Sequence, residues 1–451
     1  MMRDRPVSAE STHALQKPGL RAVFRALRHR NYRIFFWGQG ASLIGTWMQQ
    51  VALSWWVYRT TNSPFLLGMA GFMSQIPTFF ITPFAGVFAD RHSRRKMLVL
   101  TQSFSLVQAL ILAFLVLTRQ IQIWHVMALS FFLGVIFSFD IPIRQAFTIE
   151  MIENREDLGN AIALNSSMFN MARLIGPSLA GLLIASAGEG VCFLLNAVSF
   201  VPVILSLAAM RVVPPRISAP SRHILIEIKE GFGYAFRFAP IKWILILLSM
   251  ISLTGVPYQV LMPVFARDIF HGGPQTLGFL MAMSGFGALM GCIYLAARKS
   301  VIGLVRIIAW TAALFGGVII IFSLSRDLWF SMPVILVSGF AVMVNMAACN
   351  TILQTVADED KRGRVMGFYT MAFMGTMPFG SLMAGILAAR IGAPHTLLIG
   401  GASCVLVALV FMNKLPLIRK EIRPVYAKKG IIPEVPRGFQ AAAGLEGLTG
   451  E

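Results

Sequence analysis

The stretch Gly-Val-Phe-Ala-Asp-Arg-His-Ser-Arg-Arg-Lys, residues 86–96, decides how the rest of the chain is interpreted. A long apolar run ends in it, and a second apolar run begins directly after it at Met97. One carboxylate, Asp90, and a dense group of cations stand between the two runs. A short basic turn of this kind is typical of two membrane-spanning helices joined on the cytoplasmic side. We therefore expect Asp90 at the membrane interface, paired with the neighbouring cations or with a helix N-terminus.

The composition indicates a protein that lies within the lipid bilayer. Of 451 residues, 56% are hydrophobic and 13% are charged, whereas soluble domains carry about 25% charged residues. The four cysteines all lie in apolar runs without the spacing of metal ligands, so we expect small buried side chains and neither a disulfide nor a metal site.

The net charge of +19 is distributed as a membrane topology requires. Basic connections and connections with a single cation, such as Arg59 and Arg267, take turns along the chain. This alternation follows the positive-inside rule and predicts that both termini are cytoplasmic. The excess charge then faces anionic lipid, and we expect no nucleic-acid partner.

The apolar runs predict about twelve transmembrane helices, and hence an all-α membrane protein. They fall near residues 34–58, 64–89, 97–118, 123–147, 159–186, 190–209, 243–266, 275–297, 301–324, 328–353, 365–389 and 394–413. The predicted division is a cytoplasmic N-terminal segment with an amphipathic helix (1–33), a six-helix bundle (34–209), a central cytoplasmic loop (210–242), a second six-helix bundle (243–413) and a cytoplasmic tail (414–451).

The two sets of six helices resemble each other. The segment 62–68 matches 272–278, and four glycines recur at a constant spacing of 204 residues. These glycines are Gly159, Gly176, Gly181 and Gly188 in the first half and Gly363, Gly380, Gly385 and Gly392 in the second. Several matches in the same order indicate a duplication, and parallel six-helix repeats place a substrate site between the halves near mid-membrane.

A second informative stretch is Arg-Leu-Ile-Gly-Pro-Ser-Leu-Ala-Gly, residues 173–181. Gly176 and Gly181 let another helix approach closely, and Pro177 removes a backbone donor and permits a bend. A tight helix contact and a role in conformational gating are equally open interpretations. Arg173 stands about 14 residues into its span, near the midplane, and therefore needs to face protein or water.

Asp140 is the clearest carboxylate within a span, and Arg144 follows it by one helical turn. We group Asp140, Arg144 and Arg173 as a proton-coupling charge network. In that interpretation Asp140 changes its protonation as the cavity opens alternately to either side. The alternative is a permanent Asp140–Arg144 brace at the inner end of the fourth span, which is favoured because buried charges are usually paired.

Aromatic and amide side chains on the spans are candidates for lining a cavity that takes a bulky, partly apolar substrate. Hydrogen bonding between helices is the alternative for each of them. The candidates are Trp47, Gln49, Gln50, Asn165, Tyr258, Gln259, Asn345 and Asn350.

The pattern Gly-x-x-x-Asp-Arg-x-x-Arg-Arg resembles the signature loop between the second and third spans of major facilitator transporters. Ser93 stands where that family usually has a second glycine, and the charges are kept. The Gly-Pro-x-x-x-Gly core resembles a fifth-span motif of the antiporter members. We assign conformational gating to the residues of both motifs, with a topology-setting basic loop as the alternative for the first. They are Gly86, Asp90, Arg91, Arg94, Arg95, Gly176, Pro177 and Gly181.

Residues 28–33 and the two motifs together resemble the branch that holds enterobactin-type siderophore exporters and macrolide efflux proteins. That resemblance implies a bacterial inner-membrane protein that exports a siderophore, drug or related metabolite by alternating access and proton antiport. It also implies a monomer that needs no cofactor or metal. A membrane scaffold or sensor of the same fold, and a facilitator or importer, are the alternatives. No phosphate loop or esterase elbow occurs, so we expect no enzyme.

Overall fold

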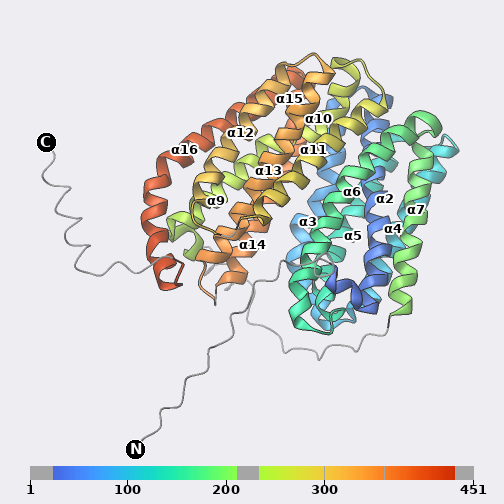
Figure 1. The fold of residues 1–451 in the computed structure, drawn as a ribbon. Coiled ribbons are helices and arrows are strands. Elements are labelled where there is room, and N and C mark those ends of the chain that lie inside the picture. The colour runs from blue at the N-terminus through green and yellow to red at the C-terminus, as the bar shows by residue number, and fades with distance from the viewer. Residues whose placement is uncertain (1–23, 211–232, 299, 360, 432–451) are drawn as a thin grey trace, which may run out of the picture.

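The computed structural model describes residues 24–210, 233–298, 300–359 and 361–431, without the side chains of residues 83, 84, 86–91 and 155. Helices make up the regular structure of these described ranges (Figure 1). The first half contains η1 (Arg25–Arg28), α2 (Arg30–Thr61), α3 (Pro64–Arg91), α4 (Arg94–Leu117), α5 (Ile123–Glu150), η2 (Arg155–Asp157), α6 (Leu158–Ala187) and α7 (Glu189–Ala209). The second half contains α9 (Ala239–Met250), η3 (Ile251–Gly255), α10 (Tyr258–Val264), η4 (Phe265–Ile269), α11 (Pro274–Ala296), α12 (Leu304–Leu324), α13 (Leu328–Val356), α14 (Arg362–Phe373), α15 (Met377–Ile391) and α16 (Ala393–Lys428).

Eleven helical segments of the described chain are long and apolar enough to cross a membrane. One of them joins α9, η3, α10 and η4, and another joins α14 and α15. The helix α2 is not among the eleven, although it has 32 residues. It carries the amides Gln39, Gln49 and Gln50 within its length, which lower its hydropathy. The structure thus agrees with the all-α membrane fold that the apolar runs predict.

Local signals in the sequence end the helices where the apolar runs end. Asn62 adopts a left-handed conformation after α2, and the Ser63 side chain accepts a hydrogen bond from the Leu66 N–H at the start of α3. Gly188 separates α6 from α7 at φ +85°, and Gly392 separates α15 from α16 at φ +83°. These two glycines are related by the 204-residue spacing, so both halves make the same turn with the same residue.

The helices pack as two sets that lie side by side in Figure 1. In one set α2 packs against α6 and α7, α3 against α5, and α4 against α5 and α7. In the other, α13 packs against α11 and α12, and α16 against α9 and α12. The largest contacts between the sets are those of α6 with α11 and of α3 with α15, and α10 adds smaller contacts with α2 and α3. The residue limits predicted for five domains stay a prediction.

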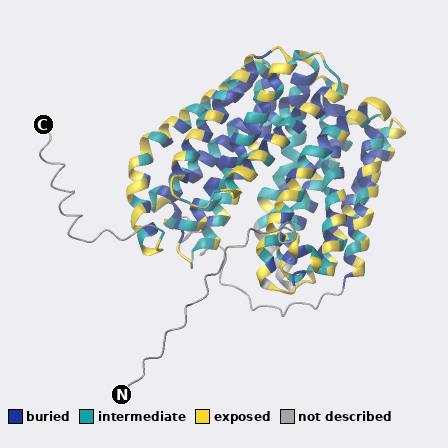
Figure 2. Ribbon diagram, viewed as in Figure 1, coloured by how far each residue is buried: buried dark blue, intermediate teal, exposed yellow. Residues whose placement is uncertain are grey.

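We call the end that carries the turn between α3 and α4 the inner end, after its predicted orientation, and the opposite end the outer end. Buried residues run along the middle of each set, and exposed ones mark its outer surface (Figure 2). Many exposed side chains are large and apolar, including Trp37, Leu205 and Trp329. A surface of this kind suits contact with lipid chains.

Three regions differ from the apolar runs. The last helix continues to Lys428, so part of the predicted tail is helical. The expected amphipathic helix before the first span is a short 3₁₀ turn, Arg25–Arg28, in its described part, and residues 1–23 lie outside the description. The seventh span contains two π-helical turns, Ile251–Gly255 and Phe265–Ile269.

Candidate functional site

Paired glycines bring the two helix sets into backbone contact toward the outer end. A Cβ on Gly181 of α6 would lie 3.1 Å from the Cα of Gly278 of α11. A Cβ on Gly68 of α3 would lie 2.7 Å from the Cα of Gly385 of α15. Gly68 corresponds to Gly278 in the internal repeat, and Gly181 corresponds to Gly385. These two glycine contacts are therefore equivalent by the duplication, and both require the absence of a side chain.

A polar latch closes the outer end beside these contacts. Arg267, in η4, donates from Nη1 to the Asn62 side-chain oxygen at 2.6 Å and to the Tyr58 and Arg59 carbonyl oxygens at 3.4 and 3.3 Å. The next residue, Asp268, accepts a hydrogen bond from the Tyr58 hydroxyl. One turn of the seventh span thus holds the C-terminal end of α2, where unpaired carbonyl groups attract a cation.

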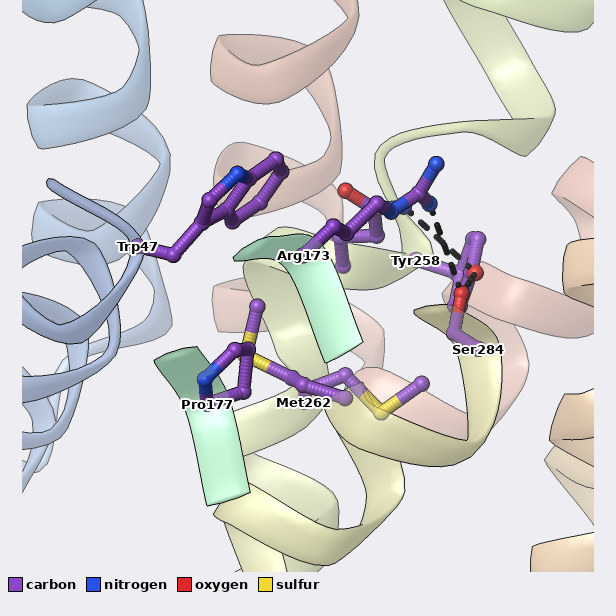
Figure 3. A pocket seen from close by; sticks show the side chains of 8 residues that line it. Trp47, Arg173, Pro177, Tyr258, Met262 and Ser284 are labelled. Atoms are coloured by element: carbon purple, nitrogen blue, oxygen red, sulfur yellow. Dashed lines mark hydrogen bonds between the residues drawn. The ribbon is translucent and has the colours of Figure 1, made fainter. Parts of the chain in front are cut away.

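A pocket lies farther in, between the two helix sets. It is lined by Trp47 of α2, Arg173 and Pro177 of α6, Tyr258, Gln259 and Met262 of α10, and Met281 and Ser284 of α11. Both halves of the chain therefore contribute to its wall (Figure 3). Its volume is about 10 Å³, which is room for about one water molecule.

The Arg173 side chain extends across this pocket toward the second helix set (Figure 3). Its Nη2 lies 3.5 Å from Ser284 Oγ, and its Cζ lies 5.9 Å from the centroid of the Trp47 ring. Ser284 Oγ is itself 2.8 Å from the Tyr258 hydroxyl. Among the described residues, no carboxylate forms an ion pair with this guanidinium, whose polar contact is one long hydrogen bond.

The residues of the Gly-Pro-x-x-x-Gly stretch pack α6 against both helix sets. A Cβ on Gly176 would lie 2.5 Å from Trp47 Cβ, so α2 passes directly against this glycine. Five residues on, Gly181 contacts α11 of the other set. The Pro177 carbonyl oxygen in turn lies close to Gly278. The stretch therefore fixes the position of Arg173 between α2 and α11.

Asp140 and Arg144 lie away from the pocket, inside the first helix set. Arg144 Nη2 is 2.7 Å from Asp140 Oδ2, an ion contact outside hydrogen-bond geometry. Asp140 Oδ1 accepts hydrogen bonds from Thr101 Oγ1 at 2.9 Å and Gln102 Nε2 at 2.7 Å. Asp140 is 1% exposed. The contacts of Asp140 described above thus come from α4 and α5, and those of Arg173 come from α2 and α11.

The basic turn ties three helices together at the inner end. Arg94 Nη1 lies 2.6 Å from Glu150 Oε1 at the end of α5. Arg95 donates to the carbonyl oxygens of Leu207 and Ala208 at the end of α7, at 2.6 and 2.5 Å. The side chains of Asp90 and Arg91 and the packing around Gly86 lie outside the described part of the chain.

The predicted cavity residues separate into two groups. Trp47, Tyr258 and Gln259 line the pocket with Arg173. The other five lie elsewhere. In the first set, Gln49 forms hydrogen bonds with Gln108 and Asn196, Asn165 forms them with Tyr32 and Thr148, and Gln50 is exposed. In the second set, Asn345 donates to the Ile308 carbonyl oxygen and to Thr311, and Asn350 accepts a hydrogen bond from Gln354. These side chains connect helices or face the surface in this conformation.

Three lining residues escape the sequence analysis. Ser284 is a single hydroxyl in an apolar run, and a scan for small polar residues on the spans would have included it. Met262 and Met281 carry no signal, because methionine is ordinary in buried helices and adapts to many packing positions.

The sequence profile of a family described as "Transmembrane secretion effector" matches residues 21–431. The chain belongs to this family of major facilitator transporters. The structure agrees: a crystal structure of a POT family transporter with a thioalcohol-conjugated peptide superposes with a TM-score of 0.68 at 12% identity, over 86% of this chain and 96% of that one. At that identity the likeness concerns the fold.

Curated relatives are transporters as well. The staphyloferrin A transporter of Staphylococcus aureus (strain NCTC 8325 / PS 47) is 25% identical over 84% of this chain and 95% of its own. Macrolide efflux protein A of Streptococcus pyogenes is 21% identical over 85% and 96%. The enterobactin exporter EntS of Citrobacter koseri is 22% identical over 91% and 96%. The resemblance to siderophore and drug exporters is confirmed by these names: the chain is a multi-pass membrane transporter and not an enzyme.

Proposed function

We propose that this transporter exports a small, partly apolar molecule that carries an anionic group, by alternating access in exchange for protons. Arg173 carries the proposal. A charge near the bilayer midplane costs about 3 kcal/mol or more unless it is compensated. Among the described residues no carboxylate pairs with Arg173, so an anion on the substrate is the natural partner. The names of the relatives support export of a siderophore or drug.

The rest of the pocket fits such a substrate. Trp47, Met262 and Met281 offer apolar and aromatic surface, and Gln259, Tyr258 and Ser284 offer hydrogen-bonding groups. In the present conformation the pocket has room for about one water molecule. The substrate therefore enters only when α6 and α11 move apart, which is the motion that alternating access requires.

The gating roles follow from the contacts at both ends. The glycine pairs and the Arg267 latch hold the outer end closed here, and we assign Gly176, Pro177 and Gly181 to the motion of α6 between the sets. At the inner end, the contacts of Arg94 with Glu150 and of Arg95 with the Leu207 and Ala208 carbonyl oxygens lie within the first helix set, which fits an inner end that can separate. The basic turns support an orientation in which this end, with both termini, faces the bacterial cytoplasm.

Uptake into inverted membrane vesicles under an imposed pH gradient tests the proposal. A siderophore or drug with a carboxylate is compared with its neutral amide. Arg173→Gln should reduce uptake of the anionic compound roughly 30-fold or more, because the carboxylate of the bound substrate is then buried without a cationic partner. Met281→Leu, in the same pocket, is the matched control and should keep uptake. Uptake of the anion that is equal in Arg173→Gln and the parent would contradict the role of Arg173, and uptake independent of the gradient would contradict antiport.

A further inference from the structure

A second cavity opens on the lipid-facing side of the second helix set and shares no lining residue with the substrate pocket. It lies at the inner end, where α11 ends and α12 begins, and its volume is about 470 Å³. It is lined by Tyr294, Arg298, Gly303, Arg306, Ile307, Trp310, Thr311 and Phe340. The helix α13 packs against both α11 and α12 and contributes Phe340 to the lining, so it forms the floor of a groove between them.

The rim of this groove at the inner end is positively charged. Arg298 donates from Nη2 to the Ile302 carbonyl oxygen at 2.9 Å, while its buried Nε has no hydrogen-bond partner among the described residues. Arg306 is exposed, and no side-chain partner for it is found in the described chain. The N-terminus of the 21-residue helix α12 lies between the two, begins after Gly303 and has no side-chain cap. Two guanidinium groups and a helix N-terminus suit a phosphate.

The part of the groove that lies nearer the membrane midplane is apolar and aromatic. The Tyr294 and Phe340 rings pack with centroids 5.7 Å apart. Trp310 is 61% exposed on the side of α12 that faces outward. An indole at the level where a helix enters the bilayer is typical of the boundary between headgroups and acyl chains. The eight lining residues include no carboxylate, so the site has a net positive charge.

We propose that this groove binds one anionic phospholipid from the inner leaflet. The phosphodiester lies between Arg298 and Arg306 at the start of α12. An acyl chain extends from there toward the membrane midplane over Trp310, Tyr294 and Phe340. Basic pockets between transmembrane helices on the cytoplasmic side are suited to anionic headgroups. A cavity of this size takes a phospholipid headgroup with the part of one acyl chain nearest to it. A bound lipid of this kind joins α11 to α12 within the second helix set.

Native mass spectrometry of the full-length protein in mild detergent tests this site, with phosphatidylglycerol and phosphatidylcholine of equal chain length. The parent should retain one phosphatidylglycerol and release phosphatidylcholine. Arg306→Gln, which breaks no described contact, should weaken retention roughly fivefold, and Arg298→Gln with Arg306→Gln roughly 30-fold, at about 1 kcal/mol per cation. Trp310→Ala should also weaken retention, through the acyl chain.

The matched control is Arg419→Gln with Lys420→Gln, which removes two exposed cations from α16 at the same end. This variant should bind phosphatidylglycerol like the parent. Equal retention in the parent and the Arg298/Arg306 variant, equal losses in the control, or equal binding of phosphatidylcholine would each overturn the proposal. Displacement of the lipid by inorganic phosphate at the same concentration would also overturn it and assign the groove to free anions.

Discussion

Gly181 of α6 and Gly278 of α11 touch backbone to backbone. A Cβ on Gly278 would lie 2.5 Å from the Pro177 carbonyl oxygen and 2.9 Å from the Gly181 Cα. The same contact recurs between Gly68 and Gly385. Because the four glycines are related in pairs by the internal repeat, a single packing solution closes the outer end at two places.

Gly181→Ala should shift the transporter toward its outward-open form. The added methyl meets backbone atoms 2.9–3.1 Å away, and overpacking of this kind costs about 1–3 kcal/mol, which changes the equilibrium roughly 5- to 150-fold. Labelling from outside at Met281→Cys, with the native cysteines replaced, measures the shift. Gly317→Ala on α12 is the control, since its Cβ would meet nothing within 4 Å. Equal labelling in both variants would show that the glycine contact does not set the closure.

Arg267→Ala should also open the outer end. Its loss removes the hydrogen bonds to Asn62 and to the last carbonyls of α2, and leaves Asp268 without a neighbouring cation. Bonds to charged groups contribute about 1.5–3 kcal/mol, so the same cysteine at position 281 should become at least tenfold easier to label. Arg326→Ala removes an outer-end cation that bonds the adjacent Ser325 carbonyl, and should leave labelling as in the parent.

Asp140→Asn should lower the stability of the protein more than it changes transport, if the brace interpretation holds. It leaves Arg144 without its anion, and breaking a buried ion pair from one side costs about 3–5 kcal/mol, less here because Arg144 is partly exposed. Thermal unfolding in detergent measures the loss. Adding Arg144→Gln should recover part of it. Gradient-driven uptake that disappears in a stable Asp140→Asn protein would instead favour the proton-coupling role.

Gln49→Leu should destabilise the first helix set. The Gln49 side chain donates to Gln108 at 3.0 Å and accepts from Asn196 at 2.7 Å, joining α2 to α4 and α7. Hydrogen bonds between membrane helices contribute about 0.6 kcal/mol on average and up to about 1.7. Gln50→Leu changes the neighbouring, exposed amide and should be close to neutral in the same unfolding measurement. Equal effects would remove the network from the stabilising contacts.

The sequence predicts which helices form and where most of them end. Apolar runs give the spans because bilayer thickness fixes their length. The end of α16 is the main exception: the helix continues as an amphipathic one in which Ile418, Ile422 and Tyr426 are buried at intervals of four. A search for that spacing would have found it, whereas a search for apolar runs stops at charged residues.

The sequence predicts the substrate pocket only in part. The depth of Arg173 in its span indicates a functional charge, but its partner Ser284 belongs to the other half of the chain. Trp47 and Gln49 show the same difficulty. Two residues apart on a helix point about 200° apart, so one lines the pocket and the other bonds inside its own set. With polar residues on several faces of α2, sequence cannot say which face meets the second half.

The two wide turns of the seventh span have a mechanical consequence. Val256 and Phe270 each bond the carbonyl five residues earlier, at 2.9 Å, so each turn holds one residue more than an α-helical one. If the turn at Ile251–Gly255 tightened to α geometry, the rest of the seventh span, α10 and η4, would rotate by about 100° about the helix axis. Tyr258 and Gln259 would then leave the pocket that they line together with Arg173, and Arg267 would lose its bonds to the C-terminal end of α2. One change of helical pitch in the seventh span would thus alter the substrate pocket and open the outer end at the same time.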